Sequence, residues 1–283
     1  MRILRSLILL VLFFILIGSL DVLPERNVAA VSQSGTCPER LLCVVFLDVG
    51  QGDSIFIQSP TETQMLIDGG RGSAVLRPLA DVMGFFDKTI DYVLITHPDS
   101  DHVGGLVSVF DRYEILHVLR TEKESETAVW QAVEERLEGE MLFARRGQTY
   151  DLGGGAVLTI LFPEADASDL ESNEASIVAR LVYGESEFLF MGDAPQEVER
   201  KLLEGDIQSD VLKVGHHGSK TSTAEEFIEV VRPTYSIISA GKDNRYGHPH
   251  AEVLENLSVS EIKNTADEGS IFMISDGKSI WFK

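Results

Sequence analysis

Short apolar runs alternate with polar turns along the first half of the chain and predict a mixture of strands and helices. The predicted strands are Leu41–Leu47, Ser54–Gln58, Gln64–Asp68, Tyr92–Thr96 and Val118–Arg120. The predicted helices are Ser73–Met83, Val103–Phe110 and Thr127–Leu137. The half therefore opens with strands and continues with alternating strands and helices.

The second half repeats this order, with several strands followed by strand–helix alternation. We expect strands at Thr149–Leu152, Val157–Phe162, Ser176–Tyr183, Ser186–Met191, Val211–Val214, Tyr235–Ser239, Glu261–Thr265, Ser270–Ser275 and Ser279–Phe282. We expect helices at Gln196–Leu203, Ala224–Val231 and Ala251–Asn256. Two similar halves of this kind predict a four-layer αββα sandwich, in which two mixed sheets face each other and helices cover them outside.

Composition supports a folded, acidic protein. Of 283 residues, 44% are hydrophobic, which excludes a disordered chain. The 45 acidic and 24 basic residues give a net charge of −21, which argues against a broad basic groove for nucleic acid. It does not exclude an enzyme acting on nucleic acid, because bound divalent cations would add local positive charge.

The N-terminus carries the pattern of an export signal. Arg2 and Arg5 precede the apolar run Leu7–Ile17, as in a cleavable signal peptide. A longer segment, residues 3–23, would be long enough for an uncleaved membrane anchor. We expect an exported protein, either secreted or anchored on the outer side of the cytoplasmic membrane. Residues 1–30 would be the signal or anchor, 31–40 a short linker and 41–283 the catalytic domain.

The two cysteines, Cys37 and Cys43, follow this segment closely. In an exported protein they would close a small disulfide loop. The alternative is two unpaired thiols, with Cys43 partly buried at the start of a strand. An extended backbone between them would hold the sulfurs too far apart to bond.

Six of the seven histidines fall in three tight groups, and each group follows a predicted strand. The first contains His97, Asp99, Asp101 and His102, four potential metal ligands within six residues. Buried carboxylates without a partner are very costly, and a metal ion removes that cost. Histidine and carboxylate ligands without cysteine suit Zn²⁺ or Mn²⁺. The seventh histidine, His117, lacks a companion and is interpreted as structural.

The other ligand candidates also lie at strand ends. Asp193 ends the apolar strand before a predicted helix, so it is either a ligand or a helix cap. His216 and His217 follow a later strand, and His248 belongs to the third group. Two metals need about seven or eight ligands. The predicted ligands are His97, Asp99, Asp101, His102, Asp193, His216 or His217, and His248.

We expect two divalent ions per chain, Zn or Mn, bridged by Asp193. Such a pair activates a water molecule for hydrolysis, most naturally of a phosphoester. Asp101 and Asp193 are the predicted catalytic carboxylates. Neither a Ser-His-Asp triad nor a phosphate-binding P-loop is visible in the sequence.

At this point the chain resembles the metallo-β-lactamase superfamily, whose first motif is His-x-His-x-Asp-His. Here Asp99 takes the place of the middle histidine, which resembles the ComEC family of competence DNA-uptake proteins and its stand-alone relatives. The resemblance implies the αββα fold, one metal site around His97 and Asp99, and a second around Asp101 and His102. The matching segments are Leu47–Ser54, Leu66–Gly70, His97–His102, Ser172–Ser176, Gly192–Asp193 and Lys213–Ser219.

The resulting hypothesis is a metal-dependent phosphodiesterase outside the cytoplasm, with single-stranded DNA among its candidate substrates. Ser219 and Lys220 beside the predicted centre suit phosphate contacts, and Asn173 lies where the family usually supplies another histidine. Few aromatic residues in these loops are available to stack on bases. The alternatives are hydrolysis of cell-wall or lipid phosphodiesters and a catalytically weak, metal-stabilised binding module. No protein partner follows from the sequence.

Overall fold

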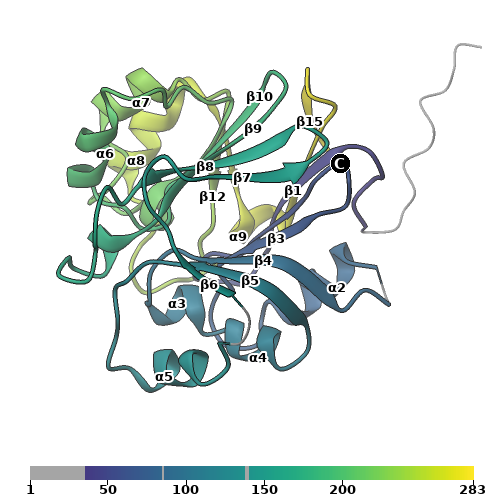
Figure 1. Cartoon of the computed structure of the whole chain (residues 1–283). Coiled ribbons are helices and arrows are strands. Elements are labelled where there is room, and N and C mark those ends of the chain that lie inside the picture. The colour runs from purple at the N-terminus through teal and green to yellow at the C-terminus, as the bar shows by residue number, and fades with distance from the viewer. Residues whose placement is uncertain (1–35, 85, 138–139) are drawn as a thin grey trace, which may run out of the picture. The chain divides into compact units, whose positions relative to one another are not determined.

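The strands of the chain form two mixed sheets that face each other, with helices on the outer face of each (Figure 1). This computed structural model describes residues 36–84, 86–137 and 140–283. The predicted signal or anchor at residues 3–23 therefore lies outside the described residues. The αββα architecture expected from the sequence is confirmed.

The first sheet has the order β15-β14-β1-β2-β3-β4-β5-β6. Strands β3 to β6 run parallel to one another, and the remaining pairs are antiparallel. The strands are β1 (Leu42–Phe46), β2 (Ile55–Gln58), β3 (Gln64–Ile67), β4 (Thr89–Ile95), β5 (Glu114–Arg120), β6 (Glu140–Phe143), β14 (Ile271–Ser275) and β15 (Ile280–Phe282).

The second sheet has the order β13-β12-β11-β10-β9-β8-β7, and its parallel part runs from β10 to β13. The strands are β7 (Thr149–Gly153), β8 (Ala156–Phe162), β9 (Val178–Tyr183), β10 (Ser186–Phe190), β11 (Val211–Lys213), β12 (Tyr235–Ile238) and β13 (Glu261–Asn264). Each sheet is thus antiparallel in one part and parallel in the other.

Helices cover the two outer faces (Figure 1). Those beside the first sheet are α2 (Leu76–Val82), α3 (Ser100–Val103), α4 (Leu106–Phe110) and α5 (Ala128–Glu134). Those beside the second are α6 (Gln196–Leu202), α7 (Glu225–Val231) and α8 (Ala251–Asn256). The remaining helical segments are α9 (Thr265–Glu268), η1 (Asn173–Ala175), η2 (Gly215–Gly218) and η3 (Leu257–Val259).

Three apolar clusters hold these layers together. The central one lies between the sheets and includes the buried Phe46, Phe188 and Phe190. A second joins α2 to α5 with the first sheet, and Trp130 is fully buried in it. A third joins α6 to α8 with the second sheet. Burial on both faces explains why apolar residues follow one another directly in part of β4, at Val93, Leu94 and Ile95.

The predicted helix Val103–Phe110 is wrong, because the structure divides this segment into α3 and α4. Gly104 and Gly105 separate the two helices, and Gly105 N–H donates to Gly70 O at 2.9 Å. A Cβ atom on Gly105 would lie 1.9 Å from Gly69 O, so the two backbones meet where no side chain fits. The division places Asp101 and His102 inside α3, directly after β4.

The disulfide alternative is the one found in the structure, which joins Cys37 to Cys43. The link ties the segment before β1 to the first buried strand. Among the described residues, no helix is both long and apolar enough to cross a membrane.

Candidate metal centre

The candidate site lies where parallel strands of both sheets end. His97 follows β4, Asp193 follows β10, and His216 and His217 follow β11. Carboxyl ends of parallel strands commonly form ligand sites, because all their following loops gather at one edge. The sequence separates these residues widely, and the fold gathers them.

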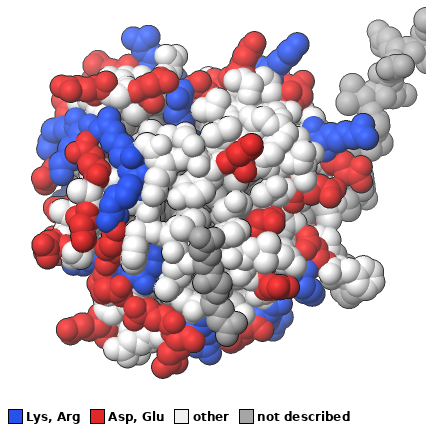
Figure 2. Space-filling view, viewed as in Figure 1, with Lys and Arg blue, Asp and Glu red and all other residues white. Residues whose placement is uncertain are grey.

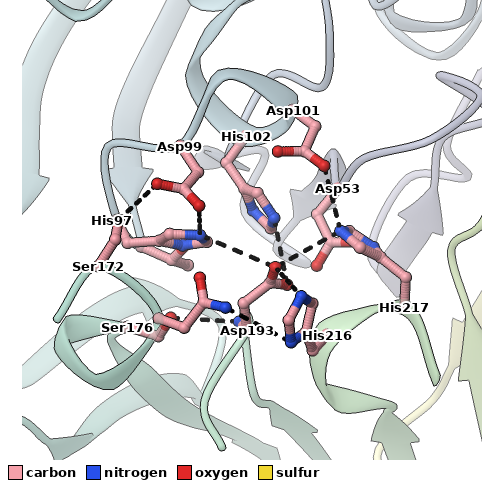
Figure 3. Close-up of polar contacts among 12 residues, drawn as sticks. Asp53, His97, Asp99, Asp101, His102, Ser172, Ser176, Asp193, His216 and His217 are labelled. Atoms are coloured by element: carbon pink, nitrogen blue, oxygen red, sulfur yellow. Dashed lines mark hydrogen bonds and ion pairs between the residues drawn. The ribbon is translucent and has the colours of Figure 1, made fainter. Parts of the chain in front are cut away.

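Asp193 lies at the centre of four histidine rings (Figure 3). His102 Nε2 is 3.2 Å from Asp193 Oδ1. The Nε2 atoms of His216 and His217 are each 3.6 Å from Oδ2, and that of His97 is 3.9 Å from it. One carboxylate therefore faces four ring nitrogens, as a bridging ligand would.

Two further carboxylates extend the cluster on opposite sides of Asp193 (Figure 3). Asp99 Oδ2 is 3.8 Å from His97 Nε2, and Asp101 Oδ2 is 3.7 Å from His217 Nε2. Their side chains are 42% and 24% exposed, whereas Asp193 is buried. The solvent-facing side of the centre is thus lined by Asp99 and Asp101.

Asp68 fixes the orientation of two of the histidines. Its carboxylate accepts hydrogen bonds from Thr96 N at 2.9 Å and Thr96 Oγ1 at 2.6 Å. His102 Nδ1 donates to the same carboxylate at 2.8 Å. Because the Thr96 hydroxyl donates its hydrogen to Asp68, its oxygen accepts a hydrogen bond from His97 Nδ1 at 3.0 Å. In their neutral forms both rings would therefore present the lone pair of Nε2 towards a cation beside Asp193.

His216 is fixed in a similar way. Thr221 Oγ1 donates to Ser219 Oγ at 3.0 Å, so it accepts from His216 Nδ1 at 3.0 Å. Asn173 Nδ2 lies 3.5 Å from the same nitrogen. His216 and His217 both have positive φ, 47° and 57°, so this turn adopts an uncommon backbone that points both rings at Asp193.

His217 is held by a backbone carbonyl and a buried ion pair. Its Nδ1 donates to Ser239 O at 2.9 Å and lies 3.2 Å from Asp53 Oδ1. The other oxygen of Asp53 pairs with Lys213 Nζ at 2.7 Å. Burial raises the pKa of the Asp53 carboxyl, but Lys213 and His217 outweigh burial and hold it below its usual range.

Several buried atoms of the centre lack hydrogen-bond partners within the described residues: Asp193 Oδ1 and the Nε2 atoms of His97, His102 and His217. A buried polar atom left unpaired costs about 1–3 kcal/mol. Four such atoms converging on one point fit a metal centre, since a cation would satisfy them together. One potential ligand atom from each of Asp53, His102, Asp193 and His217 lies within 4.8 Å of the other three.

The electrostatics also favour positive charge here. Burial raises the pKa of Asp193, but His217 and His102 outweigh burial and hold it well below its usual range. Burial lowers the pKa of His102, but Asp193 and Asp68 outweigh burial and raise it well above the usual value. Burial, followed by His102, lowers the pKa of His97 to about 4. The buried carboxylates therefore stabilise cationic charge among the rings, which bound metal ions would supply.

Residues 47–242 match the family model described as "Metallo-beta-lactamase superfamily". The chain belongs to this superfamily. Its expected resemblance to ComEC-type competence proteins is confirmed by two curated relatives. ComE operon protein 3 of Bacillus subtilis is 33% identical over 81% of this chain, and Competence protein ComA of Neisseria gonorrhoeae is 29% identical over 80%. The matches cover 32% and 31% of those proteins, so the chain spans about a third of their length.

A solved structure shares the superfamily fold at low identity. The metallo-β-lactamase fold protein YhfI from Bacillus subtilis superposes with a TM-score of 0.54 and 13% identity. The match covers 86% of this chain and 100% of YhfI. Similarity at this level extends to the fold and not to the reaction.

One predicted ligand, His248, lies beside His216 and His217 and does not face Asp193 as they do. Its ring centroid is 5.6 Å from that of His216 and 6.3 Å from that of His217. Its Nδ1 is buried and has no hydrogen-bond partner in the part of the chain that the structure describes. Burial, followed by His217, lowers the pKa of His248 to about 4. Its assignment as a ligand stays a prediction.

The predicted substrate contacts occupy different places. Ser219 is buried and accepts from Thr221, so it supports the His216 turn. The Lys220 side chain is exposed, and its backbone N–H donates to His250 Nδ1 at 3.2 Å. Asn173 lies beside His216. Among these three, Lys220 is the one whose side chain is free to reach a substrate from the rim.

Sequence reasoning did not assign Asp53, Asp68, Thr96 or Lys213 to the site. Both acids lie within segments that carried the family resemblance, and Asp68 follows an apolar strand directly. An acid between an apolar strand and a glycine pair was the available signal. Its partner could not be read from the sequence, because His102 belongs to another element.

Proposed function

We propose that this protein is a metal-dependent phosphodiesterase that acts outside the cytoplasm, with single-stranded DNA as its substrate. The observation that carries the proposal is the position of Asp193, a buried carboxylate facing four histidine Nε2 atoms. Asp99 and Asp101 add one carboxylate on each side. This donor set suits two divalent ions held by a shared ligand.

When bound, such a pair of ions would activate a water molecule and stabilise the attacking and leaving oxygens of a phosphodiester. The residues of the chain hold and orient the reactants. The buried Asp193 would help to hold the ions, and the partly exposed Asp101 would accept a hydrogen bond from the attacking water and align it. Lys220 at the rim makes a point-charge contact with a phosphate next to the cleaved one.

Two relatives support DNA as the substrate, since one is named Competence protein ComA and another, from Haemophilus influenzae and 29% identical over 80% of this chain, is named Recombination protein 2. Export is supported by the N-terminal pattern of Arg2, Arg5 and the following apolar run. The disulfide between Cys37 and Cys43 agrees with an oxidising compartment. We expect activity from a reporter that functions only outside the cytoplasm when it is fused after Lys283. Activity of a second reporter, which functions only in the cytoplasm, at the same position would refute export.

Turnover of bis(p-nitrophenyl) phosphate, followed by cleavage of single-stranded DNA, tests the reaction. Protein loaded with Zn or Mn should turn over both substrates. Asp101→Asn should lower the rate at least tenfold at equal metal content, because a neutral amide orients water poorly. Asp193→Ala should lose most of the metal, since a bridging ligand serves both ions.

Metal content by elemental analysis accompanies each rate. Asp91→Asn, on β4 and outside the centre, is the matched control and should retain wild-type turnover. Equal rates for wild type and Asp101→Asn at equal loading would show that the site assignment is wrong. Full activity of metal-free protein would refute metal dependence.

A further inference from the structure

A row of ring contacts, the first edge-on at 75° and the second stacked, leads from the candidate metal centre to the surface. The His248 ring lies 5.6 Å from that of His216, measured between centroids. Tyr246 stacks on His248 at 5.6 Å with an interplanar angle of 24°. The Arg245 guanidinium lies 5.0 Å from the Tyr246 centroid, and its Nη2 donates to Tyr246 Oη at 2.9 Å. Tyr246 is 46% exposed and Arg245 is exposed as well, so these contacts end at the surface in a ring and a guanidinium that both reach solvent.

Asn244 holds this row of ring contacts in place. Its Nδ2 donates to Gly241 O at 2.9 Å and to His248 O at 2.6 Å. Its Oδ1 accepts from Tyr246 N at 3.2 Å and from His248 N at 3.0 Å. A side chain with all these bonds made is unavailable to a phosphate, and the loop it fixes is preorganised for binding.

We propose that Arg245 and Tyr246 form a platform for a nucleobase of the strand whose phosphodiester lies at the metal centre. The inference rests on the proposed function and names the group that gives it specificity for nucleic acid. Bases stack on aromatic rings and on guanidinium planes, and both surfaces are present side by side here. A nucleobase is uncharged, so the neighbouring cation does not oppose it.

Arg245 and Tyr246 disfavour one of the alternative substrates, a cell-wall or lipid phosphodiester with a choline headgroup. The quaternary ammonium of choline would bind an aromatic ring through a cation–π contact. At Tyr246 that place is next to the Arg245 guanidinium, and two adjacent cations repel each other. Arg245 therefore favours a flat neutral base, with an anionic phosphate beside it, over a quaternary ammonium.

Stacking also resolves how a strongly acidic protein holds a polyanion. The net charge is −21, and acidic side chains are spread over the face seen in Figure 2. Long-range attraction of phosphates is therefore weak or adverse. Base stacking does not depend on the net charge of the protein. A base stacked beside the candidate metal centre would therefore contribute binding free energy that the acidic surface does not provide.

The test compares two fluorescein-labelled twelve-nucleotide oligomers: oligothymidylate and an abasic strand of the same length and charge. Full-length, metal-loaded protein carrying Asp101→Asn, which slows cleavage, is titrated by fluorescence anisotropy. We expect about tenfold tighter binding of oligothymidylate, within the range of one stacked base. Equal phosphate number removes the electrostatic contribution from this ratio.

Adding Tyr246→Ala should bring the ratio of Kd values close to one. Tyr246→Phe keeps the ring and should preserve the ratio. Trp281→Ala, which removes a partly exposed aromatic side chain on β15, should preserve it as well. Equal Kd values for the two oligomers, no binding of either, or a ratio insensitive to Tyr246→Ala would overturn the platform.

Wild-type turnover of bis(p-nitrophenyl) phosphate, measured alongside, separates the two proposals. Turnover with base-independent oligomer binding would leave the hydrolase standing and remove the platform. Base-dependent binding lost in Tyr246→Ala, without any turnover, would support the platform and refute the hydrolase.

Discussion

Single hydrogen bonds decide which nitrogen each histidine of the centre presents to Asp193. His102 Nδ1 donates to Asp68, and His217 Nδ1 donates to Ser239 O. A neutral ring whose Nδ1 carries the proton offers the lone pair of Nε2. The residues behind the rings would therefore contribute to metal affinity without being ligands themselves.

Asp68→Asn should weaken metal binding and turnover by about 10- to 100-fold, because His102 and Thr96 lose their common acceptor. Metal titration and bis(p-nitrophenyl) phosphate kinetics measure both effects. Asp91→Asn, which alters a carboxylate that accepts only from outside the centre, is the control. Unchanged affinity in Asp68→Asn would contradict the orienting role.

Lys213→Met should destabilise the protein by about 3–5 kcal/mol, since it leaves the buried Asp53 carboxylate without its cation. The double variant Lys213→Met/Asp53→Asn should be less destabilised than the single one, because the unpaired charge is gone. Urea unfolding of wild type, Lys213→Met, Asp53→Asn and the double variant gives the comparison. A double variant as unstable as the sum of its parts would show that the pair does not interact.

At the level of elements, a side chain of α6 caps the N-terminus of α7 on the outer face of the second sheet. Ala224 is the N-cap of α7 and has no side-chain acceptor to offer. Glu199 on α6 replaces it, accepting from Thr223 N and from Ala224 N at 3.0 Å. Burial raises the pKa of the Glu199 carboxyl to about 7, despite these two bonds. The cap therefore couples the packing of α6 on α7 to pH.

Glu199 should make stability fall as pH rises towards neutrality. Its folded pKa of about 7 exceeds the ordinary 4.5, so the folded state holds the proton more tightly than the unfolded state. This stabilisation is complete below the ordinary value and is lost as pH rises through the folded one. The free energy of unfolding of wild type minus that of Glu199→Gln should decrease from about pH 5.5 to about pH 8.

Urea denaturation of both proteins at the two pH values checks this difference. Other titrating groups, including those of the centre, are common to both proteins and largely cancel. A difference that stays constant or grows with pH would show that Glu199 ionises at its ordinary pKa.

At the scale of the molecule, the N-terminal end of the described chain is fastened to the first sheet. The Cys37–Cys43 disulfide bonds it to β1, a central strand between β14 and β2. Lys283 Nζ donates to Thr36 O at 2.8 Å, so both ends of the described domain meet here.

Cys37→Ser/Cys43→Ala should lower the free energy of unfolding by about 2 kcal/mol, as expected for loss of a short closed loop. Urea unfolding with and without reductant measures it. Reductant should destabilise wild type by a similar amount and leave the double variant unchanged. A double variant as stable as oxidised wild type would show that the link contributes nothing.

Most helices and strands could be predicted from local patterns, because burial on one or both faces determines which positions of an element are apolar. The helices α6, α7 and α8 lie within about one residue of their predicted ranges. The short strand β6 and helix α9 were missed, since neither carries a long apolar pattern. The break at Gly104–Gly105 was missed because its cause, contact with Gly69, lies on another element.

The sequence by itself determined the fold class and indicated the kinds of candidate metal ligand, because apolar periodicity and clusters such as His97–His102 are local. The tertiary structure decided how they combine: His216 and His217 both face Asp193, whereas His248 lies one ring further out. It also decided that Asp68 serves His102, Asp53 pairs with Lys213, and Tyr246 approaches the centre. Asp68 and His102 follow neighbouring strands of the first sheet, whereas Asp53 and Lys213 come from different sheets, so only the packing of one sheet on the other brings that ion pair within contact distance.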